Sequence, residues 1–127
     1  RPFGVSLLVA GVDPASLGGR AGLYQVDPSG AGWAWRAAAI GRGQAAAKAF
    51  LEKRYPAAAD AARADGDAEG ERPGALELQD AVHLALLALK ENFEGAMDAH
   101  NVEVGVARDG AFVVLSPAEV ADHLANL

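Results

Sequence analysis

The chain has 127 residues, about the size of one domain, and 51% of them are hydrophobic although only 6% are aromatic. Its formal net charge of −6, with scattered lysines and arginines, argues against a nucleic-acid partner, because binding to phosphates needs clustered positive charge. The absence of cysteine excludes disulfides and thiolate metal sites, and the absence of an apolar run of about eighteen residues argues against a membrane-spanning helix.

Three strands are expected in the first third of the chain. Apolar runs predict a buried strand at 3–10, a short strand at 23–26 and a third strand at 32–40. The second and third are separated by a turn with favourable chemistry at each position, Asp27-Pro28-Ser29-Gly30. Short connections indicate an antiparallel meander. Trp33 and Trp35 share one face of the third strand, which we expect to be covered by helices or another chain rather than to bind a ligand.

Two helices and a polar segment are expected next. A helix is predicted over 44–55 and a second over 76–94, and the second has an apolar stripe and a capping glycine at its end. The stripe and the cap are Leu78, Val82, Ala85, Leu86, Leu89, Phe93 and Gly95. Between the helices, 56–74 has no large apolar residue and is expected to be a solvated low-complexity loop.

A hairpin and a final helix complete the chain. Val102, Val104 and Val106 alternate with other residues, as in a half-buried strand, and Asp109-Gly110 is a strong two-residue turn signal before a partner strand at 111–115. Ser116 and Glu119 have the spacing of a capping box at the start of the last helix. The order βββ–α–α–ββ–α predicts an α+β fold with helices on antiparallel sheets.

A glycine-rich loop suggests nucleotide binding, but its surroundings do not. Residues 41–46 (GRGQAA), from Gly41 to Ala46, match the G-x-G-x-x-A pattern between a strand and a helix. A dinucleotide site also needs a parallel strand that ends in an acidic residue about twenty positions later. Here that region is the polar loop, so we expect a glycine-hinged turn and no cofactor.

Acidic residues and histidines give no metal-binding pattern. Residues 65–70 (DGDAEG) resemble the start of a calcium loop, but its twelfth position, which requires a glutamate, is Leu76. The three histidines, His83, His100 and His123, lack the spacing of metal ligands. We therefore expect no metal site and interpret the acidic run as solvated.

No catalytic constellation is expected. Asp80 and His83 lie three apart on a predicted helix, where a surface hydrogen bond is the expected interaction. A Ser-His-Asp site could in principle use Ser6, Ser29 or Ser116, but we expect these in a strand, a turn and a helix cap, and none has a nucleophile-elbow pattern. The sequence contains no threonine.

Segments along nearly the whole chain resemble proteasome alpha subunits. The general resemblance lies in 1–8 (RPFGVSLL), 23–30 (LYQVDPSG) and 35–41 (WRAAAIG), including Arg1, Pro2, Phe3, Gly4, Asp27, Pro28, Ser29, Gly30 and Gly41. A closer similarity to the type-2 branch of that family lies in 50–55 (FLEKRY), 76–83 (LELQDAVH), 89–95 (LKENFEG) and 101–106 (NVEVGV). The run 115–120 (LSPAEV) fits as well.

The resemblance implies a fold that this chain fills only in part. The family fold is a four-layer αββα sandwich, shared with amino-terminal-nucleophile hydrolases, and 1–127 would be one partial domain from its carboxyl-terminal half. The family's amino-terminal half, with its gate-forming tail and activator pocket, has no counterpart here, and the chain lacks an initiator methionine. We therefore expect a piece of something longer, with its sheet edges and one sheet face uncovered.

The resemblance also implies a non-catalytic role. Related beta subunits cleave peptides with an amino-terminal threonine, which this sequence lacks. The expected role is that of an alpha-ring subunit in ring assembly, substrate gating and activator docking during ubiquitin-dependent protein catabolism. Expected partners are other alpha subunits, beta subunits and, through the whole ring, a regulatory particle or activators, with no nucleic acid and no membrane. The family occupies cytoplasm and nucleus.

Two other functional hypotheses stay open at this point. One is a truncated, divergent product that no longer assembles. The other, which the surroundings of the loop disfavour, is a small nucleotide-binding enzyme that uses residues 41–46.

Overall fold

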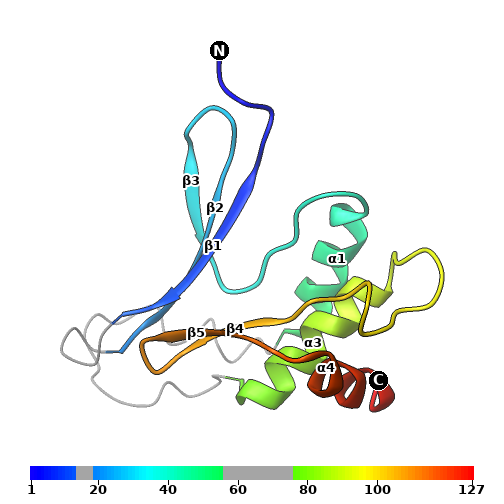
Figure 1. The fold of residues 1–127 in the computed structure, drawn as a ribbon. Helices are drawn as coiled ribbons and strands as arrows, with labels where there is room; N and C mark the ends of the chain where they lie inside the picture. The colour runs from blue at the N-terminus through cyan, green and yellow to red at the C-terminus, as the bar shows by residue number, and fades with distance from the viewer. Residues whose placement is uncertain (14–18, 56–75) are drawn as a thin grey trace.

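The structure is a computed structural model that describes residues 1–13, 19–55 and 76–127 (Figure 1). These residues form an α+β fold, as the order of predicted elements indicated, with one three-stranded and one two-stranded antiparallel sheet. The described elements are β1 (Leu7–Val12), β2 (Ala21–Val26), β3 (Gly32–Trp35), α1 (Gln44–Arg54), α3 (Leu78–Lys90), β4 (Gly105–Arg108), β5 (Ala111–Val114) and α4 (Pro117–Ala125).

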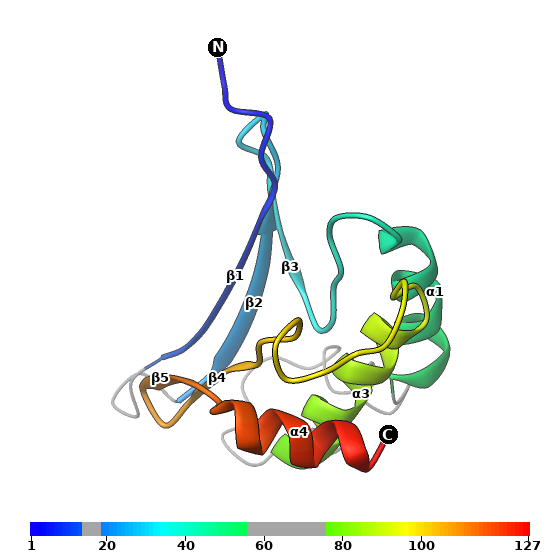
Figure 2. The same cartoon turned by 45° about the vertical axis from the view of Figure 1, so that its right-hand side comes forward.

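The first sheet is the predicted meander, with the order β1-β2-β3. Leu7, the first residue of β1, pairs with Val26, the last residue of β2. Trp35, the last residue of β3, pairs with Leu23 of β2. The sheet stands away from the helices as a curved blade, and the amino terminus lies at its outer end (Figure 2). A sheet in this position can present both of its faces.

The limits of all three strands differ from those predicted, and β2 begins at Ala21 and not at residue 23. The first strand begins at Leu7 and not at residue 3, because its partner β2 ends at Val26 and the chain then turns. The third strand ends at Trp35 and not at residue 40, and the chain after it leads away toward α1 (Figure 2). The apolar pattern continued in both places, but a strand needs a partner as well as a pattern.

The second sheet is the predicted hairpin of β4 and β5. Asp109 (φ 52°) and Gly110 (φ 73°) both have positive φ, as a two-residue type I′ turn requires, and Arg108 pairs with Ala111 across it. Val102 and Val106 are buried and Val104 is half-buried, so the predicted inward side of this segment is confirmed, although β4 itself begins at Gly105.

The main core lies between α3, α4 and the segment that leads into β4. Its buried members are Val82, Leu86, Val102, Val106 and Val120, of which Val120 is only 1% exposed. Helix α1 also contacts α3, and each helix has one buried residue outside the main cluster, Leu51 in α1 and Ala88 in α3. Every buried apolar residue of the described chain thus lies outside β1, β2 and β3.

Helix α3 is shorter than predicted, and its stripe is only partly covered. It ends at Lys90, where the backbone N–H groups of Asn92 and Phe93 donate to carbonyls three residues earlier and tighten the last turn. Gly95 has the predicted positive φ (94°), but it lies too far beyond Lys90 to cap the helix. Of the predicted stripe, Leu89 is 46% exposed and Ala85 is exposed as well.

The capping box at the start of α4 is confirmed. The Glu119 backbone N–H donates to Ser116 Oγ at 3.4 Å, and the Ser116 backbone N–H donates to Glu119 Oε2 at 2.7 Å. Pro117 occupies the first helical position, where no N–H is needed. The capping box fixes the first turn of α4 and therefore the position of Val120, which packs in the main core.

Replacing Ser116 by alanine is therefore expected to destabilise α4 by about 1 kcal/mol, because the first turn loses its side-chain acceptor. The loss should appear as faster amide hydrogen exchange in α4, by about five- to tenfold, without a change in α1. A Ser116→Asp variant keeps an acceptor at the cap and should exchange more slowly than Ser116→Ala. Equal exchange in all three proteins would show that the cap does not stabilise the helix.

Candidate functional site

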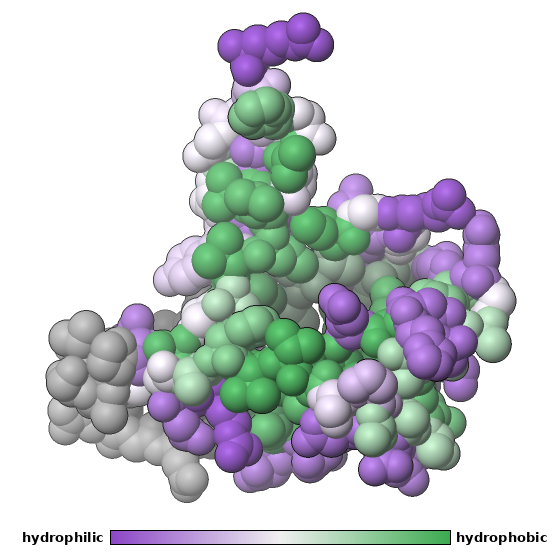
Figure 3. All heavy atoms as spheres, in the orientation of Figure 1, coloured by the Kyte–Doolittle hydropathy of each residue, from purple (hydrophilic) through white to green (hydrophobic). Residues whose placement is uncertain are grey.

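The three-stranded sheet has no buried residue. Its side chains are exposed or half-buried in all three strands, including large apolar ones such as Trp33 (48% exposed) and Trp35 (42% exposed). The hydropathy surface shows apolar residues gathered along this blade (Figure 3). The prediction that 3–10 forms a buried strand is therefore wrong for this chain, because residues 3–10 are all exposed although β1 contacts β4.

The strand register sorts these side chains into two apolar faces. Residues that pair across an antiparallel sheet point to the same side. One side, here called the tryptophan face, consists of Leu8, Ala10, Leu23, Gln25, Trp33 and Trp35. The other side, here called the tyrosine face, consists of Leu7, Val9, Tyr24, Val26 and Ala34. Both faces carry exposed large residues, whereas we expected only one uncovered face.

The tryptophan face has one contact with a helix and one unpaired polar atom. The ammonium nitrogen of Lys48, on α1, lies 5.4 Å from the centre of the Trp35 ring, so this face is turned toward α1. Between Leu8 and Trp33, the side-chain oxygen of Gln25 is buried, and none of the described residues donates a hydrogen bond to it. An unpaired buried acceptor is unfavourable, so this face has an unsatisfied polar group as well as exposed apolar area.

The second sheet is also exposed. Phe112, Val113 and Val114 of β5 are 67%, 54% and 56% exposed, so both sides of this strand are open. The Phe112 ring lies over Gly105 of β4, where a Cβ atom would come within 2.7 Å of it. A two-stranded hairpin is marginally stable by itself, and β5 offers a free apolar edge. The sequence predicted the hairpin but not this exposure.

Two of the sequence motifs meet at the outer end of the blade. Leu7 pairs with Val26, so the residues before β1 and the turn after β2 lie at the same end of the sheet (Figure 1). The residues before β1 include the exposed Arg1, Pro2, Phe3 and Gly4, and the turn is 27–30. Sequence reasoning treated these motifs separately, and the strand pairing brings them to one end.

The turn at 27–30 is held by its own side chains. The backbone N–H and the hydroxyl of Ser29 both donate to Asp27 Oδ1, at 2.9 and 2.5 Å, and the Gly30 N–H donates to the Asp27 carbonyl at 3.0 Å. Gly30 has a φ of 84°, which favours glycine. The Ser29 hydroxyl, with the backbone N–H groups of Ser29 and Ala31, holds the pKa of Asp27 below its ordinary value of 3.8.

This turn is expected to weaken in acid. A carboxyl group with a lowered folded-state pKa stabilises the fold above its unfolded pKa, and that stability is lost as the pH falls through the folded value. Replacing Ser29 by alanine removes the main cause of the shift, so the Asp27 titration midpoint in carbon-detected NMR should rise. Glu119, whose pKa is lowered by Ser116, is the internal control and should not move. An unchanged Asp27 midpoint would contradict this account.

The glycine-rich loop leads from β3 into α1 and contacts the residues that follow α3. Gly41 and Gly43 have φ values of 94° and 73°, and a Cβ atom on Gly43 would lie 2.7 Å from Asn92 Cβ. Arg42 and Glu94 form an exposed ion pair at 3.0 Å, which contributes little to stability. The glycines thus let the start of α1 approach the end of α3. The described strands around it are antiparallel, as in our expectation of a glycine-hinged turn.

The other candidate residues lie apart. Among the described hydrogen bonds there is none between Asp80 and His83, and Ser116 serves as the helix cap. Across residues 1–13, 19–55 and 76–127 there is no group of three or more histidine, aspartate or glutamate side chains that could hold a metal ion. The predicted loop at 56–74, with the acidic run at 65–70, lies entirely outside the described residues. No helix in the described part of the chain is long and apolar enough to cross a membrane.

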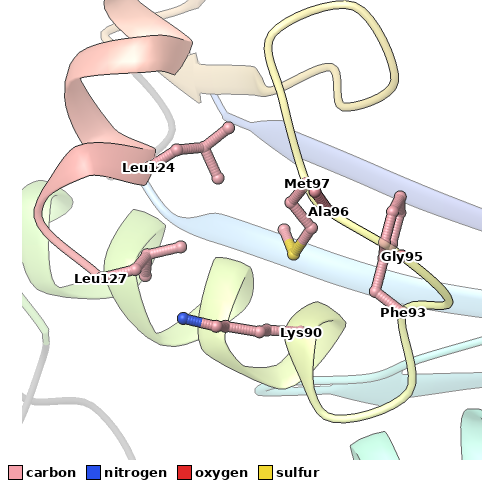
Figure 4. Close-up of a pocket in the computed structure, with 7 residues that line it drawn as sticks. All are labelled: Lys90, Phe93, Gly95, Ala96, Met97, Leu124 and Leu127. Atoms are coloured by element: carbon pink, nitrogen blue, oxygen red, sulfur yellow. The ribbon is translucent and has the colours of Figure 1, made fainter.

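A hollow of about 220 Å³ lies between the end of α3, residues 93–97 and α4 (Figure 4). Phe93, Met97, Leu124 and Leu127 supply its apolar lining, and Lys90 is its charged member. It has no second polar side chain to orient a ligand, so we do not assign it a catalytic or cofactor role.

Comparison with known sequences defines the class of protein. The family model described as "Proteasome subunit" matches residues 1–107, which is most of the chain. The chain therefore belongs to the proteasome subunit family, as its motifs suggested. Membership implies the α+β fold of amino-terminal-nucleophile hydrolases, and the described sheets and helices agree with that class.

Within the family, the chain is similar to alpha type-2 subunits. It is 46% identical over 125 residues to "Proteasome subunit alpha type-2" of Oryza sativa subsp. indica, 45% over 128 residues to "Proteasome subunit alpha type-2-A" of Arabidopsis thaliana, and 46% over 127 residues to "Proteasome subunit alpha type-2" of Drosophila melanogaster. These alignments cover 98%, 100% and 100% of this chain, but only 44%, 46% and 45% of the relatives. The chain spans less than half the length of these relatives.

Proposed function

We propose that this chain is the carboxyl-terminal part of a non-catalytic alpha-ring subunit of the proteasome core particle. The similarity to alpha type-2 subunits across the whole chain supports this role. The chain would contribute to ring assembly, to the restriction of substrate entry and to the docking of activators in ubiquitin-dependent protein catabolism. Its partners would be other alpha subunits, beta subunits and, through the complete ring, a regulatory particle or activators.

The observation that carries the proposal is the absence of any buried residue in β1, β2 and β3. Monomeric proteins rarely expose large contiguous apolar patches, and such patches mark surfaces that another element covers. Here two faces of one sheet and both sides of β5 are open at once. In the proposed αββα sandwich these faces are covered by the rest of the polypeptide, the second sheet and adjacent subunits.

We propose a structural rather than a catalytic role because the relatives are named as alpha-type subunits. Threonine chemistry of the beta-subunit kind needs an amino-terminal threonine whose own amine acts as base, and none of the 127 residues is threonine. In this proposal, the motif residues at the outer end of the three-stranded sheet shape that end of the sheet. These residues are Arg1–Gly4 and Asp27–Gly30. We propose residence in the cytoplasm and the nucleus, where the family works.

Purification of the natural protein tests this function. An affinity tag on the natural protein should recover a particle that contains alpha-type and beta-type proteasome subunits, and native mass spectrometry should find the chain in a complex of seven-membered rings. A single, monodisperse protein that melts cooperatively alone would contradict the proposal. Absence of the chain from purified core particles, with the transcript present, would support the alternative of a product that does not assemble.

A further inference from the structure

We draw no further inference here: the strongest candidate, the apolar hollow between the carboxyl-terminal end of α3, residues 93–97 and α4, carries none because nothing in the structure shows what occupies it.

Discussion

Replacing Leu86 by alanine should destabilise the α3–α4 core by about 2–5 kcal/mol. Leu86 is 3% exposed and lies in the cluster with Val82, Val106 and Val120, so the change removes buried methyl groups and leaves a cavity. At tenfold per 1.4 kcal/mol, the amides of α3 should exchange with deuterium about 30-fold faster or more. Hydrogen exchange on the purified assembled protein measures this, because the chain need not be stable alone.

Leu86→Met is the matched control for that experiment. Methionine conserves the volume of the side chain and usually costs less than about 1.5 kcal/mol. Exchange in α3 should therefore stay much closer to the unmodified protein in Leu86→Met than in Leu86→Ala. If both variants exchange at the original rate, the core does not lie where the structure places it.

Replacing Trp33 and Trp35 together by serine should impair assembly more than folding. The two rings are about half exposed, so full cover on assembly would remove roughly 100 Å² of apolar surface for each. At about 25 cal/mol per Å², burying the pair would contribute about 5 kcal/mol before the costs of ordering and association are subtracted, so the serine variant should lose much of the contact that covers this face. Recovery of the variant in core particles, measured against the unmodified chain in the same cells, should fall accordingly.

The same variant should behave oppositely when it is expressed alone. With less exposed apolar area, the isolated chain should aggregate less than the unmodified chain, which a merely misfolded variant would not do. Trp33→Phe with Trp35→Phe keeps apolar aromatic rings on this face and should still assemble. Normal assembly of the serine variant would show that the tryptophan face is not covered in the particle.

Local features could be predicted from the sequence because their signals lie within a few residues. Asp109-Gly110 and the Ser116–Glu119 box each specify a backbone conformation by themselves, and both appear as predicted. The turn 27–30 belongs to the same class. Family membership could also be predicted, because several runs of residues along the chain resemble the family in order, and no single short motif would have been enough.

Burial was harder to predict, because periodicity identifies apolar side chains but not what covers them. Residues 3–10 read as a buried strand, yet Leu7 and Val9 are 53% and 51% exposed. On α3 the predicted stripe includes Leu89, which is also exposed, whereas Ala88 lies outside the stripe and is buried. The sequence does not indicate which apolar side chains lack a covering element within the chain. The exposure of these side chains could therefore be learned only from the structure.

Hydroxyl-radical footprinting of the natural particle tests the central claim most directly. The rate of oxidation of Trp33 and Trp35 should be compared between the chain in purified core particles and the same chain expressed alone. If the tryptophan face is buried by other parts of the particle, both rings should be strongly protected in the particle and oxidised readily in isolation. Equal oxidation of these two rings in both states would contradict the account.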